Sequence, residues 1–232
     1  MKTYIILGVL LFSFVFTNAQ SHEYKAAMKA ALKIHDDAKS VAEEIKAMEA
    51  FEKVTGDFPN EWLANYWAAY LCTQVSRLKT DRADQFPENL DEKELIYRAQ
   101  KYYDKAYELK TNKSDKDKSD FHMLQAFIYS WFNYRIAETD EEKEKFIKMR
   151  EDEYFKAAKY NPSNPMLFVR IGMKLTRSKD DYASLVSAIA LMEYAKGIFE
   201  KSPDRSTTTY YNKDMIGFWK SRAEKKLKVI QQ

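Results

Sequence analysis

The chain has little of several residue types that particular folds require. Among its 232 residues are one cysteine, five glycines and five prolines. The single cysteine, Cys72, excludes an intramolecular disulfide. So few turn residues disfavour a sandwich or barrel with many hairpins. Lys and Arg number 38 against 35 Asp and Glu. A charge so close to balance gives no strong attraction to nucleic acid or to an anionic membrane.

Motifs of catalysis and metal binding are also missing. The three histidines lack the spacing of a zinc motif, and there is no glycine-rich phosphate loop, nucleophile elbow or calcium loop. Cys72 lies in an apolar segment, where a buried cysteine behaves as a small hydrophobe. The acidic clusters at 140–142 and 180–181 fall in predicted first helical turns, where negative charge stabilises the helix dipole. We therefore expect a non-catalytic protein without a cofactor or a metal.

The first residues have the composition of a secretory signal peptide. Lys2 is followed by a largely apolar run of thirteen residues, 4–16, and then by the small residues Thr17 and Ala19. Because a helix needs about twenty residues to cross a bilayer, we expect cleavage after Ala19 rather than an uncleaved anchor. No later stretch approaches eighteen uninterrupted apolar residues. The prediction is a mature domain over 20–232, in the periplasm or secreted, without stable membrane insertion.

The remaining chain has the periodicity of a helical protein. Apolar residues recur every three or four positions, and most prolines and glycines fall where a helix begins or ends. The pattern predicts an all-α fold of about nine helices, at roughly 21–35, 40–56, 60–76, 91–110, 121–136, 139–160, from 164 onward, 181–201 and 213–229. The charged segments 77–88 and 111–118 are predicted loops. Three helices begin with capping-box residues: Ser40 with Glu43, Asp91 with Glu94, and Thr139 with Glu142.

Four of these helices share one internal spacing. A small residue, an aromatic residue and a second small residue stand at i, i+4 and i+7, and a helix-ending residue follows five positions later. The copies are Ala47, Phe51 and Val54; Ala99, Tyr103 and Ala106; Arg150, Tyr154 and Ala157; and Ala190, Tyr194 and Gly197, before Ser202. Val54 and Arg150 depart from the small-residue rule. Because the three positions share a helix face, we expect them to pack against a neighbouring helix.

This spacing resembles the second helix of the tetratricopeptide repeat. The most similar copy is AQKYYDKAYELKTN at 99–112, and NPMLFVRIGMKL at 164–175 resembles the first helix, with Gly172 at the family's glycine position. Successive copies are 52, 51 and 40 residues apart, whereas the family repeat is 34 residues long. The resemblance covers most of 40–202. It implies antiparallel helix pairs stacked as an alpha-alpha superhelix in a single domain.

The resemblance also implies a binding surface on the concave side. First helices would line it with Leu63, Tyr66, Tyr70, Met123, Phe127, Val169 and Met173. Members of the family that bind carboxylates place Lys and Asn there, whereas this chain has Tyr66 and Tyr70, so that recognition is not implied. We expect an envelope protein or peptide as partner. Two alternatives stay open: a small glycan or lipid ligand in an aromatic-lined groove, and core packing of these side chains in a short, closed bundle.

The last predicted helix is basic. Its cations are Lys220, Arg222, Lys225, Lys226 and Lys228, beside the apolar residues Phe218, Trp219 and Leu227. An amphipathic basic helix can lie on an anionic membrane surface. It can equally be the polar cap that ends a helical stack.

Overall fold

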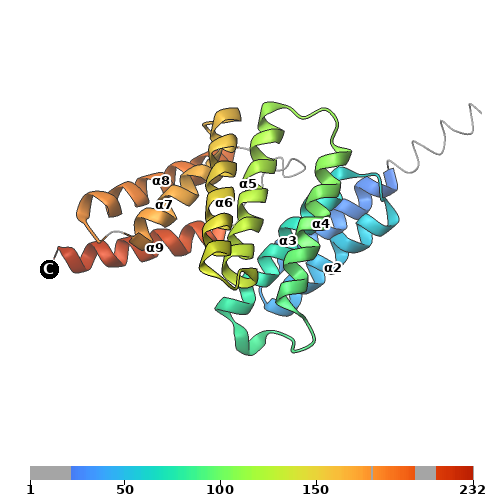
Figure 1. Cartoon of the computed structure of the whole chain (residues 1–232), viewed down its shortest axis with the longest axis horizontal. Coiled ribbons are helices and arrows are strands. Elements are labelled where there is room, and N and C mark those ends of the chain that lie inside the picture. Colours follow the sequence, from blue (N-terminus) through green and yellow to red (C-terminus); the bar gives the residue numbers. More distant parts are fainter. Residues whose placement is uncertain (1–21, 179, 202–212, 232) are drawn as a thin grey trace, which may run out of the picture. The chain divides into compact units, whose positions relative to one another are not determined.

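The protein is all-α. The computed structural model describes residues 22–178, 180–201 and 213–231, and these residues contain helices and loops but no strand (Figure 1). Its helices pack in neighbouring pairs, which confirms the fold class expected from the periodicity. The predicted signal peptide with its cleavage position after Ala19, and the helix-ending Ser202, lie outside the described residues.

The chain divides into two compact units, and the first extends to Thr111. Residues 22–37 are helical and precede α2 (Val41–Asp57), α3 (Trp62–Asp81), the short 3-10 helix η1 (Ala83–Gln85) and α4 (Glu92–Leu109). Helix α3 packs against both α2 and α4. Its middle is therefore buried at every residue from Ala64 to Ser76.

The second unit begins at Asn112. It contains α5 (Asp115–Trp131), the π-helix η2 (Phe132–Ile136), α6 (Asp140–Tyr160), α7 (Pro165–Ser178), α8 (Tyr182–Lys201) and α9 (Lys213–Ile230). Helices α5 and α6 form one pair, and α8 packs against both α7 and α9 (Figure 1). The expectation of a single repeat domain stays a prediction.

Helix beginnings follow the capping residues of the sequence. The side chains of Ser40 and Thr139 each accept a hydrogen bond from the backbone N–H three residues later. In return, the carboxylates of Glu43 and Glu142 accept a hydrogen bond from the backbone N–H of the capping residue. Two of the three predicted capping boxes are therefore confirmed. Asp91 caps α4 through the backbone N–H of Lys93 at 2.8 Å, so it is a cap without the reciprocal contact expected from Glu94.

Both predicted loops are shorter than expected. Helix α3 continues to Asp81, and η1 occupies part of the segment 77–88. In the segment 111–118, Ser114 and Asp117 form a third capping box, which begins α5 at Asp115. Asp at the third helical position satisfies the cap backbone as Glu does, because both supply a carboxylate acceptor. At 132–136 the expected α-helix gives way to η2.

The repeated spacing has different surroundings in its four copies. The first two copies are buried in full, and in the third Ala157 is buried while Tyr154 is half-buried. In the fourth copy Ala190 and Tyr194 are exposed. The buried face of α8 lies two residues earlier in the chain and has the same spacing, with Ala188, Met192 and Ala195. For α8 the packing register was therefore predicted two positions late.

Gly172 permits a close approach between α7 and α8. A Cβ atom at Gly172 would lie 2.9 Å from Cε of Met192 and 3.2 Å from the backbone oxygen of Ala188. A Cβ at Gly197 would meet nothing within 4 Å. A side chain at position 172 would therefore require Met192 to shift and the Ala188 backbone to give slightly, whereas at Gly197 space is left for a side chain.

Candidate functional site

The side chains expected on a concave binding face lie mainly in the interior. Tyr66 and Val169 have no exposed surface, Tyr70 and Met123 have 1%, Phe127 has 4% and Met173 has 7%. Leu63 is half-buried. The rings of Tyr66 and Tyr70 contact Trp62 and Trp67 edge-on. A partner could reach such side chains only after the helices separate, so we place the candidate site elsewhere.

Cys72 has an environment that suppresses thiol chemistry. Its side chain is fully buried, and Sγ donates to Oε1 of Glu52 at 3.8 Å. The same carboxylate oxygen accepts from the Arg98 guanidinium. Burial, and next the negative charge of Glu52, raise the pKa of the Cys72 thiol above its ordinary value. The nucleophilic thiolate is therefore disfavoured at neutral pH.

A second titratable cluster joins α5 and α6. Nδ1 of His122 lies 2.6 Å from Oε2 of Glu153, and Nζ of Lys156 donates to Oε1 at 2.6 Å. The His122 ring lies parallel to Tyr160, with 5.5 Å between centroids. Burial by itself raises the pKa of Glu153, but the hydrogen bonds from His122 and Lys156 outweigh it and lower the pKa below its ordinary value. The cluster therefore holds an ionised carboxylate between two helices.

Replacing Glu153 with glutamine is expected to lower the free energy of unfolding at pH 7 by about 1–2 kcal/mol. A carboxylate whose pKa is lowered by folding contributes stability above its unfolded pKa of about 4.3, and that stability is lost as the pH falls through the folded pKa. The difference from wild type should therefore be present at neutral pH and shrink below pH ~4. Urea unfolding at several pH values measures it.

The control for this prediction is Glu144→Gln, on the exposed surface of α6. It should change the stability by no more than about 0.5 kcal/mol at any pH. A Glu153→Gln deficit that is independent of pH would contradict the assigned role of the carboxylate.

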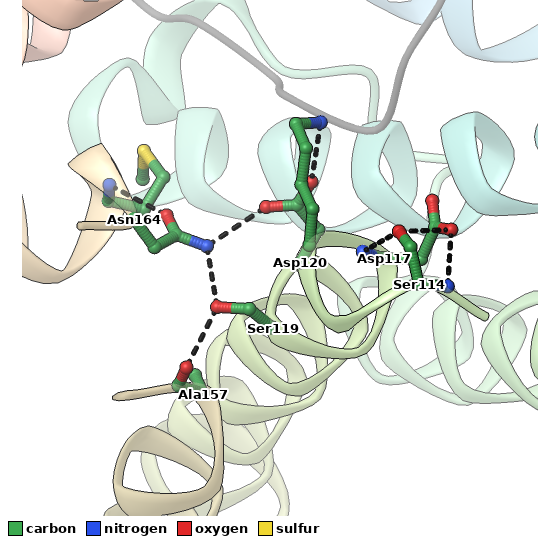
Figure 2. A network of polar contacts seen from close by, with 8 residues as sticks. Ser114, Asp117, Ser119, Asp120, Ala157 and Asn164 are labelled. Carbon is green, nitrogen blue, oxygen red and sulfur yellow. Dashed lines mark hydrogen bonds and ion pairs between the residues drawn. The ribbon is translucent and has the colours of Figure 1, made fainter. Parts of the chain in front are cut away.

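A buried polar network connects the beginning of α5, the end of α6 and the beginning of α7 (Figure 2). Nδ2 of Asn164 donates to Oγ of Ser119 and to Oδ1 of Asp120, both at 2.9 Å. Ser119 in turn donates to the backbone oxygen of Ala157 at 2.9 Å. Oδ1 of Asn164 accepts from the backbone N–H of Met166 at 3.0 Å and so caps α7. Its polar groups satisfy one another, which is the arrangement of a structural network.

The most unusual surface is on α8. No charged residue occurs between Tyr182 and Met192, although the helix is buried on one side only. We define the outward face of α8 as five of its exposed residues, Ala183, Val186, Ser187, Ala190 and Tyr194; the charged residues Glu193, Lys196, Glu200 and Lys201 of the same helix are exposed as well, towards its end. At 100° per residue they fall within about one third of the helix circumference. Ordinary solvent-facing helix surfaces carry charged residues, so an uncharged one indicates a contact surface.

Residues of α7 extend this apolar surface. The rings of Phe168 and Tyr194 meet edge-on across the helix pair at 4.9 Å between centroids. Ile171 on α7 is 48% exposed, against 55% for Tyr194 and 39% for Val186. Three large apolar side chains on one helix pair are therefore available to a partner. The sequence signal for Val186 is the uncharged run 182–192, from which no prediction was made.

The part of the chain that the structure describes offers neither a metal site nor a membrane span. In the described part of the chain, no three His, Cys, Asp or Glu side chains are placed to hold a metal ion. Among the helices of these residues, none has the length and apolar character needed to cross a membrane. Comparisons with protein-family models, curated proteins and solved structures found no match.

Proposed function

We propose that this chain is an exported, non-catalytic helical-repeat protein that binds another protein or a peptide in the bacterial envelope, in the periplasm or after secretion. The predicted signal peptide supports export, and the resemblance to the tetratricopeptide repeat supports a binding role. The observation that carries the proposal is the outward face of α8, an uncharged helix surface with Val186 and Tyr194 exposed.

The outward face of α8 is poorly solvated when it is left in water. Apolar side chains in water lose the stabilisation of burial, about 25 cal/mol per Å². Tyrosine is also enriched at protein interfaces, because its ring buries a large area at a low entropy cost. Ala183, Ser187 and Ala190 lie beside Val186 and Tyr194, and small residues let a partner backbone approach closely. The face is thus suited to a protein surface or a helix.

The proposal is tested by placing a photo-crosslinking residue at Ala190 in cells that export the protein. We expect one envelope protein to be crosslinked there and identified by mass spectrometry. A crosslinker at Lys159, exposed on α6, should not give that product. The identified protein is then purified, and its affinity is measured with the substitutions Val186→Glu and Ala190→Glu combined. A charge buried in the interface should weaken binding at least about tenfold.

A matched control makes the same change in net charge and removes larger apolar side chains. Ile147→Glu combined with Phe155→Glu places two glutamates on α6, where these side chains are 40% and 74% exposed. This control should bind with wild-type affinity, and both variants should keep the wild-type circular dichroism spectrum. Equal loss in both variants would show that α8 is not the contact surface. Absence of a specific crosslink would overturn the binding role.

A further inference from the structure

Helix α9 carries a second exposed row of different chemistry. Phe218, Arg222, Lys225 and Val229 are all exposed, and they follow one another at intervals of four, three and four residues. This interval places them in a single stripe along one side of the helix. Phe218 is 58% and Val229 is 73% exposed. We call these four residues the α9 row. It has an apolar residue at each end and two cations in the middle.

The opposite side of α9 is fixed to the rest of the unit. Met215, Ile216, Trp219 and Ala223 are buried, and α9 packs against α8 and α7. Nζ of Lys226 donates to the backbone oxygen of Thr176 at 2.8 Å and to Asp180 at 2.5 Å, while Lys220 pairs with Glu193 of α8. The apolar side of α9 is therefore occupied, and the α9 row is held at the surface in a fixed orientation.

The cations of the α9 row lack acidic partners within the described part of the chain. Lys220 and Lys226 are paired, and Glu224 is directed to Lys220 at 3.5 Å. Arg222 lies over the face of Trp219, with its guanidinium carbon 5.6 Å from the ring centroid. Arg222 and Lys225 line a shallow hollow together with Phe218 and Ser221. The result is a local positive surface on a chain whose total charge is only +3.

We propose that the α9 row binds an amphipathic α-helix of a partner protein, which has two acidic residues in the middle and an apolar residue at each end. The proposal deepens the function proposed above and rests on it. Charge complementarity specifies the acidic residues, and Phe218 and Val229 specify the apolar ends. The interval of four, three and four is the row spacing through which α-helices pack side by side, so a helix of the same spacing matches all four positions.

A membrane surface fits this row less well. A helix that lies in a bilayer interface inserts a continuous apolar face, whereas the apolar face of α9 is packed against α7 and α8. The two exposed apolar residues of the α9 row are eleven positions apart, which is about 16 Å along a helix. Both cations stand between them. Such a row matches discrete side chains rather than a lipid layer.

The test uses purified protein and a fluorescent helical peptide with Leu at two positions eleven residues apart and Glu at the fourth and seventh positions after the first Leu. Fluorescence anisotropy should show binding that weakens as the salt concentration rises, because screening reduces the attraction. Arg222→Glu combined with Lys225→Glu should weaken binding at least about tenfold. A peptide with Lys in place of both Glu residues should bind this variant and not the wild type.

The matched control is Lys148→Glu combined with Lys159→Glu, which changes the net charge equally on the exposed surface of α6. It should bind the acidic peptide as wild type does. Equal weakening in both variants, or failure of the charge-reversed peptide to restore binding, would overturn the proposal. So would binding of vesicles of phosphatidylglycerol that depends on Arg222 and Lys225 while the peptide does not bind. The peptide assay needs no envelope partner. A negative result in this assay can therefore be distinguished from a negative result in the crosslinking experiment at α8.

Discussion

Phe51→Ala is expected to lower the free energy of unfolding by about 3–5 kcal/mol, the usual cost of removing a fully buried phenylalanine ring. Phe51 has no exposed surface, and its ring lies nearly parallel to Trp67 of α3 with 5.5 Å between the centroids. Ala47 and Val54 fill the same face of α2. The surrounding helices cannot close the space without moving Trp67, so a cavity should remain.

Urea denaturation followed by far-UV circular dichroism measures this loss. The matched control is Phe155→Ala, because Phe155 is 74% exposed on α6. Its removal should change the stability by no more than about 0.5 kcal/mol. Similar losses in the two variants would mean that Phe51 does not hold α2 against α3, and that the stacked arrangement with Trp67 is wrong.

Helix beginnings were the most predictable part of the fold. Capping is decided locally, by a hydroxyl or carboxylate within three residues of the backbone groups that it satisfies. Ser40 and Thr139 therefore gave correct predictions without any knowledge of tertiary structure. Ser114 was missed only because Asp117, rather than Glu, completes its capping box.

Helix continuations were less predictable, because they depend on neighbours distant in the sequence. The polar composition of 77–81 indicated a loop, yet α3 continues to Asp81 and packs against α4. The π-helix at 132–136 inserts an extra residue into a turn, and Phe132 packs parallel to Phe146 of α6 at 5.3 Å. Nothing in the local pattern of 121–136 distinguishes this from a regular α-helix.

The candidate surface was the least predictable feature. Helix α8 has the same four-and-three spacing of small and large residues on two sides, at Ala188, Met192 and Ala195 and at Ala190, Tyr194 and Gly197. Periodicity alone cannot decide which of two equivalent sides is buried. The packing of α7 decides it, because Gly172 lets α7 approach the side of α8 that carries Ala188 and Met192. The aromatic residues Tyr66 and Tyr70 presented the same ambiguity between surface and core.

Asn164→Ala is expected to lower the free energy of unfolding by about 2–4 kcal/mol. The substitution removes the cap of α7, which costs about 1 kcal/mol, and a buried donor to Ser119 and Asp120, which costs about 1–3 kcal/mol more. Asn164 has no exposed surface, so water does not replace the lost contacts easily. Asn161→Ala is the control, because Asn161 makes a local hydrogen bond with the backbone N–H of Ser163 at 3.2 Å. Its loss should cost less than about 1 kcal/mol.

The variant Asn164→Asp separates the two contributions. Aspartate keeps the acceptor for the backbone N–H of Met166, but it has no N–H to donate to Ser119 and places a second carboxylate beside Asp120. Two adjacent carboxylates raise the pKa of one of them in the folded state. A raised pKa gives stability that is present at low pH and lost as the pH rises, so this variant should approach wild type near pH 4 and fall below it at pH 7. Wild-type stability of this variant at both pH values would show that α7 depends on the cap alone, and that the buried network does not join the three helices.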